Sequence, residues 1–421
     1  MPVIKPFKGI RYNPEKIEEL GDVVCLPYDQ ITDEMDIFYK TKSPYNFVRL
    51  VLTKYTNGHN RRKEYNEARK YIEQWQRNKI FIQEEEPAIY PYIQKFSVLG
   101  NEYTRKAFIC LIKLEELGKN ILPHERTLSK PKEDRLNLLR ITKKDLEPVF
   151  LLYIDEKNYI NKLLEKYYQE EPLIDIKDDD QVEHKLWCAT DPKIQDKIAK
   201  RLEDSIFVIA DGHHRYETAL NYLRELRVKD PEHPACYKLV ALVNIEDKGL
   251  VILPTHRLIK KVEDFNLGTF LKKTSEYFDI KKTDRKNIAQ QLAEARVHTF
   301  GFYSQETAYI LKLKSLDTMK QLLPERSESY QNLDVAILHT VMIEKILGIK
   351  PEQTEELIRY ERGIEDTMRQ VDSGKFQFCF LMNPTRPTQV RDVAQNRERM
   401  PQKSTDFYPK LISGLVFYNL E

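Results

Sequence analysis

The stretch SIFVIADGHHRYETALNYLRE, residues 205–225, predicts a strand, a tight turn and a helix in direct succession. Residues 206–210 form a short apolar run of the buried-strand type, and Asp211-Gly212 interrupts it. Apolar side chains then recur at three- and four-residue spacing, which is typical of a helix with one buried face. Backbone N–H groups at the start of a helix lack intrahelical acceptors and favour a negative charge. We therefore expect an anion site at this turn.

The side chains of this turn strengthen that expectation. Gly212 lets a phosphate group approach the backbone closely, while His213 and His214 add hydrogen-bond donors. Arg215 is able to hold two phosphate oxygens at once. Asp211, at the end of the strand, is a candidate ligand for a metal ion. The alternative is a purely structural turn, in which Asp211 caps the helix and the histidines bond locally.

A second polar cluster, PHERTLSKPKEDR, covers residues 123–135 and predicts a loop followed by a helix. Glu125 is the candidate base that accepts a proton from a substrate hydroxyl. The other candidates are two cations for phosphate and two polar side chains for the acceptor, namely Lys130, Arg135, His124 and Thr127. The alternative is a solvated connection without a site.

Three further turns carry candidate side chains. His256 and Arg257 lie at the end of a strand and are candidates for binding substrate. Lys403, in PQKST, is a candidate phosphate cation. Asp29 follows an apolar strand at 23–26 and is a second candidate metal ligand. A simple turn is the alternative for each.

Length and composition limit the classes of protein. The chain has 421 residues, a formal net charge of +2 and five cysteines without a Cys-x-x-Cys pair. No window approaches the roughly 20 apolar residues of a membrane-spanning helix, and neither the dinucleotide-binding glycine fingerprint nor a P-loop occurs. We expect a cytoplasmic protein with reduced thiols, a small-molecule substrate and no membrane partner. The low net charge makes nucleic acid an unfavoured partner, and a homo-oligomer is left open.

The remaining pattern predicts a mixed α/β fold whose sheets contain hairpins. We expect a helix over 61–79, a hairpin over 88–115 and a second hairpin that joins 239–245 to 249–256. The strongly charged residues 156–183 predict a solvated excursion, and residues 411–418 a final strand. We divide the chain into an N-terminal and central α/β region, 1–260, and a C-terminal α+β region, 261–421.

Several motifs together resemble the DUF1015 family, which is defined by sequence and has no function in its name. They are PFKGIRYNPEK (6–16), LPYDQIT (26–32), PHERTLSKPKEDRLNLLR (123–140), IADGHHRYETAL (209–220), GLVILPTHR (249–257) and MPQKSTDFYPKLISGLV (400–416). The DGHHR element alone also resembles the phosphate-binding signature of the ParB and sulfiredoxin-like superfamily, which includes free-serine kinases. That resemblance implies that residues 212–215 contact nucleotide phosphates, with Asp211 at the edge of the site.

These observations lead to one preferred function and two alternatives. The preferred function is a kinase that uses ATP or ADP with Mg²⁺ to phosphorylate a small-molecule hydroxyl, with free L-serine as the favoured acceptor. In it, Glu125, Asp211 and residues 213–215 form the catalytic group. The first alternative is a nucleotide-binding switch or interaction module without turnover. The second is a ParB-like DNA-binding protein or nuclease, which would require a basic face.

Overall fold

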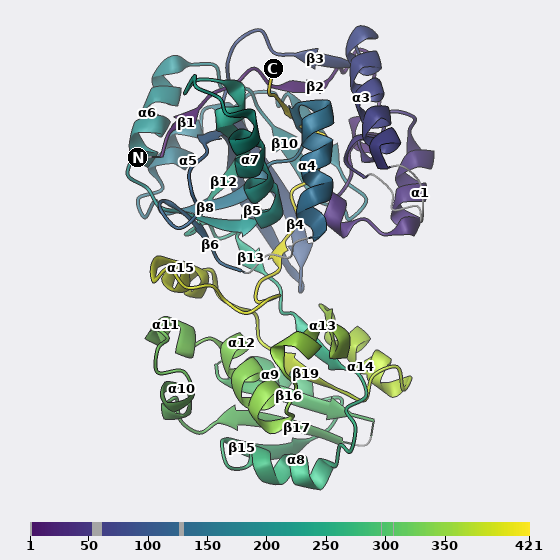
Figure 1. Ribbon diagram of the computed structural model, residues 1–421, viewed down its shortest axis with the longest axis vertical. Helices are drawn as coiled ribbons and strands as arrows, with labels where there is room; N and C mark the ends of the chain where they lie inside the picture. The colour runs from purple at the N-terminus through teal and green to yellow at the C-terminus, as the bar shows by residue number, and fades with distance from the viewer. Residues whose placement is uncertain (1, 53–60, 126–129, 296, 306) are drawn as a thin grey trace. The chain divides into compact units, whose positions relative to one another are not determined.

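The computed structural model describes residues 2–52, 61–125, 130–295, 297–305 and 307–421, without the side chains of 61–63, 130 and 131. The chain forms two compact units (Figure 1). Unit 1 contains Met1–Pro123, Thr127–Leu250 and Pro409–Glu421, and unit 2 contains His124–Arg126 and Val251–Tyr408. The expected division at residue 260 differs from these units because the C-terminal segment returns to unit 1, where it buries Leu411, Leu415 and Phe417.

Unit 1 is built on a mixed nine-stranded sheet, as far as the described residues show. Its path is β6-β11-β8-β12-β5-β4-β10-β9, and β1 also pairs with β5. The pairs β6–β11 and β8–β12 are parallel, and the others are antiparallel. The strands are β1 (Ile4–Lys5), β4 (Tyr90–Val98), β5 (Asn101–Lys113), β6 (Ile121–Pro123), β8 (Val149–Tyr153), β9 (Ile174–Lys177), β10 (Glu183–Leu186), β11 (Phe207–Asp211) and β12 (Tyr237–Asn244). The mixed α/β class expected from the sequence is confirmed.

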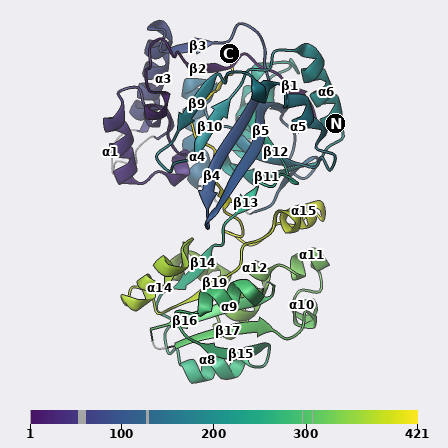
Figure 2. The ribbon, with the colours of Figure 1, turned by 180° about the vertical axis from the view of Figure 1, so that it is seen from behind.

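Helices cover this sheet on one face and form a second core beside it. Apolar residues of α5, α6 and α7 share one core with the sheet, whereas α1, α2 and α3 enclose another core with part of α4. Helices α4 and α7 lie side by side in Figure 1, and Figure 2 shows the β4–β5 hairpin from behind. The helices are α1 (Asp33–Lys42), α2 (Val48–Val51), α3 (Arg61–Arg77), α4 (Lys130–Thr142), α5 (Tyr159–Leu164), α6 (Pro192–Leu202) and α7 (His213–Leu226). Two small sheets complete unit 1: β2 (Ile10–Tyr12) with β3 (Phe81–Gln83), and β7 (Lys144–Asp145) with β21 (Tyr418–Asn419).

One expected hairpin is confirmed and the other is wrong. Strands β4 and β5 pair around Leu99 and Gly100, both at positive φ, as a type I′ two-residue turn requires. The expected partner of β12 instead belongs to unit 2. All residues of β12 are buried because β5 and β8 flank it on both sides. Its continuous apolar run is therefore the mark of a central strand and not of a hairpin arm.

Two other expectations are corrected. Residues 156–183 are not only a solvated excursion, because they include α5 and β9, and Asp178 Oδ2 makes a partly buried contact of 2.9 Å with Nε2 of His184 in β10. Residues 411–418 do not form one strand; within them only isolated bridges and the start of β21 occur. A long regular strand would need a continuous partner edge, whereas this segment is buried in the core side chain by side chain.

Unit 2 centres on an antiparallel sheet of order β15-β17-β16-β19-β14-β18. One face packs on α9 and α14, and on the other face the ring of Phe270 in α8 stacks on Phe302 at 4.9 Å. The strands are β14 (His256–Ile259), β15 (Phe278–Thr283), β16 (Thr299–Ser304), β17 (Thr307–Leu313), β18 (Ile358–Glu361) and β19 (Phe378–Met382), with β13 (Val251–Ile252) paired to β20 (Phe407–Tyr408). The helices are α8 (Leu267–Thr274), α9 (Ile288–Ala295), α10 (Asp317–Leu322), α11 (Glu328–Gln331), α12 (Asp334–Ile337), α13 (Thr354–Leu357), α14 (Ile364–Asp372) and α15 (Pro387–Gln395), and α12 continues as a π-helix over Leu338–Ile346.

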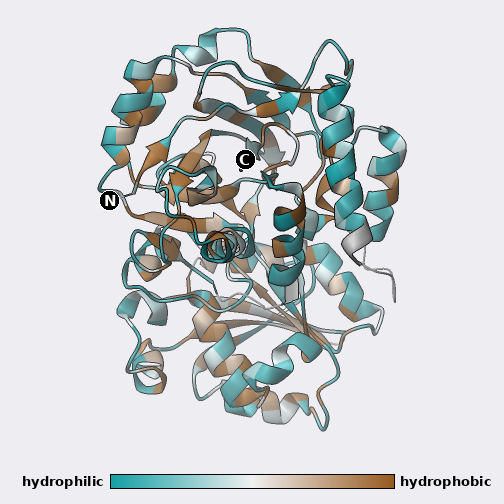
Figure 3. Ribbon diagram, turned by 45° about the horizontal axis from the view of Figure 1, so that its top comes forward, coloured by the Kyte–Doolittle hydropathy of each residue, from teal (hydrophilic) through white to brown (hydrophobic). Residues whose placement is uncertain are grey.

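Hydropathy follows this architecture. In Figure 3 the strands carry most of the hydrophobic residues, and the outer helices are largely hydrophilic. Among the residues that the structure describes, no helix has both the length and the apolar character needed to span a bilayer.

Candidate functional site

The strand-turn-helix element predicted from the sequence is present in unit 1. Strand β11 ends at Asp211, and α7 begins at His213. Gly212 between them has φ of +88°, and a Cβ atom there would lie 2.9 Å from Nε of Arg215. Both the left-handed backbone and the close guanidinium therefore require glycine. His213 and His214 form the first turn of α7 and are half-buried.

Arg215 is held among carboxylates. Its Nη1 donates to the carbonyl of Pro148 at 2.7 Å, and its Nη2 donates to Asp211 Oδ2 at 2.9 Å. Burial alone would lower the pKa of Arg215, but the carboxylates of Glu147, Asp211 and Asp29 raise it above its usual value. The guanidinium is therefore a fixed positive charge at the start of α7.

Asp29 lies near Asp211, so two carboxylates share this site. Asp29 belongs to a short 3₁₀ turn, Tyr28–Gln30, and its side chain reaches solvent. Protein atoms nevertheless displace much of its hydration. That loss, together with the charge of Asp211, raises the pKa of Asp29, against the opposing effect of Arg215 and Lys410. Lys410 Nζ lies 4.0 Å from Asp211 Oδ1.

Buried contacts fix the segment that carries Asp29. Glu147 Oε1 accepts from the backbone N–H of Tyr28 at 3.2 Å and from Ser413 Oγ at 2.8 Å. The guanidinium of Arg135, from α4, lies 4.0 Å from the centre of the Tyr28 ring and donates to the carbonyl of Val51 at 2.6 Å. Arg135 thus contacts the residue next to Asp29.

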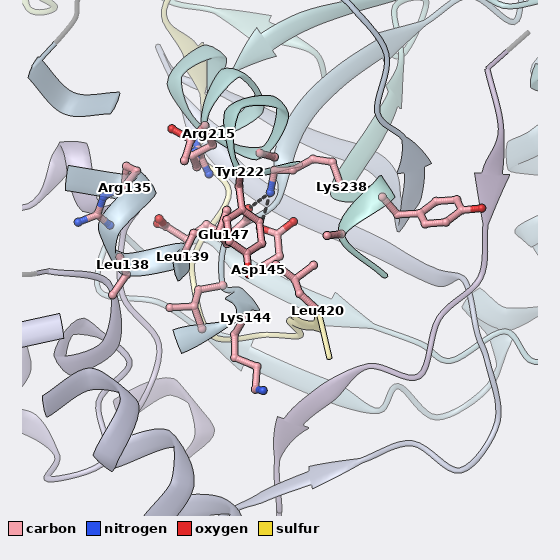
Figure 4. A pocket seen from close by; sticks show the side chains of 15 residues that line it. Arg135, Leu138, Leu139, Lys144, Asp145, Glu147, Arg215, Tyr222, Lys238 and Leu420 are labelled. Carbon is pink, nitrogen blue, oxygen red and sulfur yellow. Dashed lines mark hydrogen bonds and ion pairs between the residues drawn. The ribbon is translucent and has the colours of Figure 1, made fainter. Parts of the chain in front are cut away.

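A pocket lies between α4 and α7, on the inner side of Arg215 (Figure 4). Lys238 crosses it, in an ion pair with Asp145 and with a 2.9 Å hydrogen bond to the carbonyl of Glu147. The pocket has a volume of about 50 Å³, which accommodates a few water molecules. Because the pocket is too small for a nucleotide, a nucleotide would have to bind on the outer side of the Gly212 turn.

A second group of predicted residues meets in unit 2. Glu125 Oε1 accepts from the backbone N–H groups of Ser404 and Thr405 at 3.1 and 3.3 Å and from Thr405 Oγ1 at 3.3 Å. His124 Nε2 contacts Thr405 Oγ1 at 2.7 Å, and its carbonyl accepts from the N–H of Met400 at 2.7 Å. These contacts fasten the 124–125 segment to the loop at 400–405.

Arg257 extends this group. It is fully buried and donates to the carbonyls of Thr255 and, at 3.0 Å, Lys403, while its guanidinium lies 5.3 Å from the centre of the Tyr360 ring. His256 Nδ1 accepts from the N–H of Met382 at 3.2 Å. Burial and the charge of Arg257 lower the pKa of His256 to about 3, so this imidazole is neutral.

The predicted site residues therefore fall into two sets. Unit 1 contains Asp29, Arg135, Asp211, Gly212, His213, His214 and Arg215, and unit 2 contains His124, Glu125, His256, Arg257 and Lys403. Thr127 and the side chain of Lys130 lie outside the described residues. The sequence did not single out Glu147, Tyr28 or Lys410. The last two lie in the quoted motifs LPYDQIT and MPQKSTDFYPKLISGLV, whereas Glu147 has no local signal.

Comparison with known proteins identifies the family. A family model described as "Protein of unknown function (DUF1015)" matches residues 4–336. The chain belongs to the DUF1015 family. No curated protein matches this DUF1015 chain.

Similar solved structures are distant. A conserved hypothetical protein from Pyrococcus furiosus has 13% identity and a TM-score of 0.36, covering 74% of this chain and 95% of its own. A free serine kinase mutant in complex with AMP has 13% identity and a TM-score of 0.37, with 71% and 87% covered. SbnI with a C-terminal truncation from Staphylococcus aureus has 11% identity and a TM-score of 0.36, with 74% and 86% covered. These TM-scores are all below 0.5, so the similarities carry no functional assignment for the DUF1015 chain.

Proposed function

We propose that this protein is a nucleotide-dependent kinase that transfers a phosphoryl group to the hydroxyl of a small molecule. ATP or ADP with Mg²⁺ is the donor, and free L-serine is the favoured acceptor. The observation that carries the proposal is the glycine turn at Gly212, which opens a helix beside the carboxylates of Asp29 and Asp211. Phosphoryl transfer needs positioning and charge neutralisation more than covalent chemistry by the protein.

In this proposal the nucleotide phosphates bind at the start of α7. The positive φ of Gly212 and the absence of a side chain there give a phosphate access to the first N–H groups of the helix. His213 and His214 donate hydrogen bonds from the first turn, and Arg215 supplies fixed positive charge behind them.

In the same proposal the carboxylate pair is the magnesium site. Mg²⁺ prefers oxygen ligands and is commonly held by one or two carboxylates together with substrate phosphates and water. Asp29 and Asp211 would hold it, and its charge would neutralise the phosphates. The charge of Asp211 still raises the pKa of Asp29 in the presence of Arg215 and Lys410, so a divalent ion between the two aspartates would relieve their repulsion.

A proton acceptor completes the reaction. The hydroxyl oxygen of the acceptor forms a bond to the terminal phosphorus of the nucleotide, the bond from that phosphorus to the bridging oxygen breaks, and the hydroxyl proton passes to a carboxylate. Asp29 is the acceptor that we propose in unit 1, because its side chain reaches solvent. Glu125, the base predicted from the sequence, uses Oε1 to accept from the loop at 404–405.

A phosphoryl-transfer assay tests the proposal. The wild type and His214→Ala are incubated with Mg²⁺, ATP or ADP, and a panel of amino acids and small alcohols, and phosphorylated products are measured. We expect a serine-dependent product that His214→Ala reduces about 10- to 100-fold, as for loss of a charge-assisted contact. Nucleotide binding without turnover would contradict the kinase and favour the switch; no nucleotide binding would contradict both.

A further inference from the structure

The C-terminal return of the chain brings a lysine to the carboxylates of unit 1. Residues Pro409–Glu421 belong to unit 1, and Lys410 is the second residue of this segment. Its Nζ lies 4.0 Å from Asp211 Oδ1, and its charge lowers the pKa of Asp29 against the stronger effects of burial and Asp211. The ammonium thus acts on both carboxylates.

Two side chains of the β4–β5 hairpin hold the main chain on either side of the Lys410 side chain. Arg105 Nη2 donates to the carbonyl of Pro409 at 2.6 Å. Gln94 Nε2 donates to the carbonyl of Lys410 at 3.1 Å, and Gln94 Oε1 accepts from Arg105 Nε at 3.0 Å. Arg105 and Gln94 face each other across the hairpin, in register, so one strand pair supplies the whole clamp.

Burying the charge of Arg105 in this clamp costs the fold free energy. Arg105 is fully buried, its guanidinium lies 4.9 Å from the centre of the Phe150 ring, and loss of hydration lowers its pKa to about 10. A buried cation that donates to carbonyl and amide oxygens stabilises a fold less than apolar packing would. Arg105 and Gln94 instead each hold one of two consecutive carbonyls, Pro409 and Lys410, and thereby fix the direction in which the Lys410 side chain leaves the main chain.

The charges of the site call for such a cation. Arg215 already uses Nη1 on Pro148 and Nη2 on Asp211. A nucleotide phosphate that approaches Asp29 and Asp211 adds negative charge to two carboxylates. We propose that Lys410 is the cation that binds this phosphate and that Arg105 and Gln94 are its positioning residues. The proposal rests on the nucleotide site proposed above, and it gives Lys410 the task that the sequence had suggested for Lys130 or Lys403.

Calorimetric titration of the full chain with ADP and with adenosine tests the role of Lys410. We expect Lys410→Ala to raise the Kd for ADP about 10- to 100-fold, as for loss of a charge-assisted contact, and to leave the Kd for adenosine unchanged. Lys95→Ala is the matched control, because Lys95 is exposed, lies next to Gln94 in β4 and has the same charge. Equal weakening by both variants, or an unchanged Kd for ADP in Lys410→Ala, would overturn the proposal.

The positioning role needs a separate readout. Arg105→Lys keeps the buried charge but loses the forked geometry. We expect it to reduce the preference for ADP over adenosine at least 5-fold, and to have no further effect on this preference in the Lys410→Ala background. An additive effect in the double variant would show that Arg105 does not act through Lys410. If the wild type binds no ADP, both the proposed nucleotide site and the proposed role of Lys410 are wrong. If the wild type binds ADP and Lys410→Ala leaves the Kd for ADP unchanged, only the role of Lys410 is wrong.

Discussion

The two sets of predicted residues use the same side-chain types in opposite ways. In unit 1, Arg215 acts on three carboxylates, and one of them, Asp29, reaches solvent. In unit 2, Arg257 is fully buried and donates to the main chain, while Glu125 accepts from main-chain N–H groups. The first arrangement concentrates charge at a helix start, whereas the second fastens two stretches of chain together.

The difference shows what distinguishes a candidate binding site from a structural contact. Both regions combine arginine, histidine and a carboxylate, and the sequence offers candidate site residues in both. In the unit 1 group, neighbouring carboxylates raise the pKa of Asp29, and a bound cation would offset their mutual repulsion. In the unit 2 group, Glu125 and Arg257 form hydrogen bonds with main-chain groups, which is typical of a structural role.

Removal of the two arginines should have unequal effects on stability. Arg215→Met leaves Glu147, Asp211 and Asp29 without their shared cation, and we expect a loss of about 3–5 kcal/mol in the free energy of unfolding. Arg257→Met leaves mainly carbonyl groups unpaired, so about 1–3 kcal/mol is expected. Both tryptophans, Trp75 and Trp187, belong to unit 1, so their fluorescence in a denaturant series measures the unfolding of unit 1 in Arg215→Met. Calorimetry measures the unfolding of Arg257→Met, whose substitution lies in unit 2.

Equal losses in these two variants would break the comparison. Such a result would mean that the charge of Arg257 also depends on a carboxylate, and Glu125 is the one whose charge reaches it. Combining Arg257→Met with Glu125→Gln would then identify the dependence as a coupling energy.

The carboxylates of the two regions should differ in their effect on turnover. For Asp29→Asn we expect kcat to fall about 100-fold, because this substitution removes the proposed proton acceptor. For Glu125→Gln we expect a smaller fall, because an amide oxygen still accepts from Ser404 and Thr405. Steady-state kinetics with saturating nucleotide and serine measures both. A larger fall in Glu125→Gln would restore the base predicted from the sequence and make Asp29 a metal ligand only.

Acid should weaken unit 2 through its buried histidines. Burial and the charge of Arg257 lower the pKa of His256 and of His339 to about 3, below the value near 6.5 of an unfolded chain. The unfolded chain therefore binds more protons as pH falls from 6.5 toward 3, and each histidine costs about 1.4 kcal/mol per pH unit within that range. His339→Leu should remove one histidine's share of this loss. Calorimetric scans at pH 7 and pH 5 test it, and an unchanged pH dependence would contradict the neutral state of His339.

Local signals predicted the parts of the fold that depend on neighbouring residues. The turn at Gly212 and the hairpin at Leu99-Gly100 both follow from a glycine in a left-handed conformation between two regular segments. The second expected hairpin failed because β12 pairs with β5 and β8, two strands distant in sequence. An apolar run reports burial but not the identity of its partners.

The candidate site was predictable to the same extent. Asp29 and Asp211 were recognised separately as strand-end aspartates, but their proximity depends on how distant segments pack. Glu147 precedes Pro148 in an ordinary context, and Lys410 reaches the site only because the chain returns to unit 1. The residues 124–125, 253–257 and 400–405 likewise gave no sign that they belong to a second unit.

The smallest expected effect is a difference in sign between two carboxylate-to-amide substitutions. The native pKa of Asp29 is raised, so between the ordinary value of aspartate and this raised value the folded chain binds more protons than the unfolded chain. Stability then falls as pH rises through that range, and the penalty persists at neutral pH. Asp29→Asn should therefore be slightly more stable than the wild type at pH 7 and lose this advantage below the ordinary pKa of aspartate. Asp196→Asn, an exposed change in α6, should stay within about 0.5 kcal/mol of the wild type.

Glu125→Gln should instead lose about 0.5–1.5 kcal/mol, because its main-chain donors keep an acceptor but lose the negative charge. Neutralising a carboxylate stabilises the fold only where neighbouring charges repel that carboxylate. If both Asp29→Asn and Glu125→Gln lowered the free energy of unfolding at pH 7, Asp29 would therefore stabilise the fold as Glu125 does.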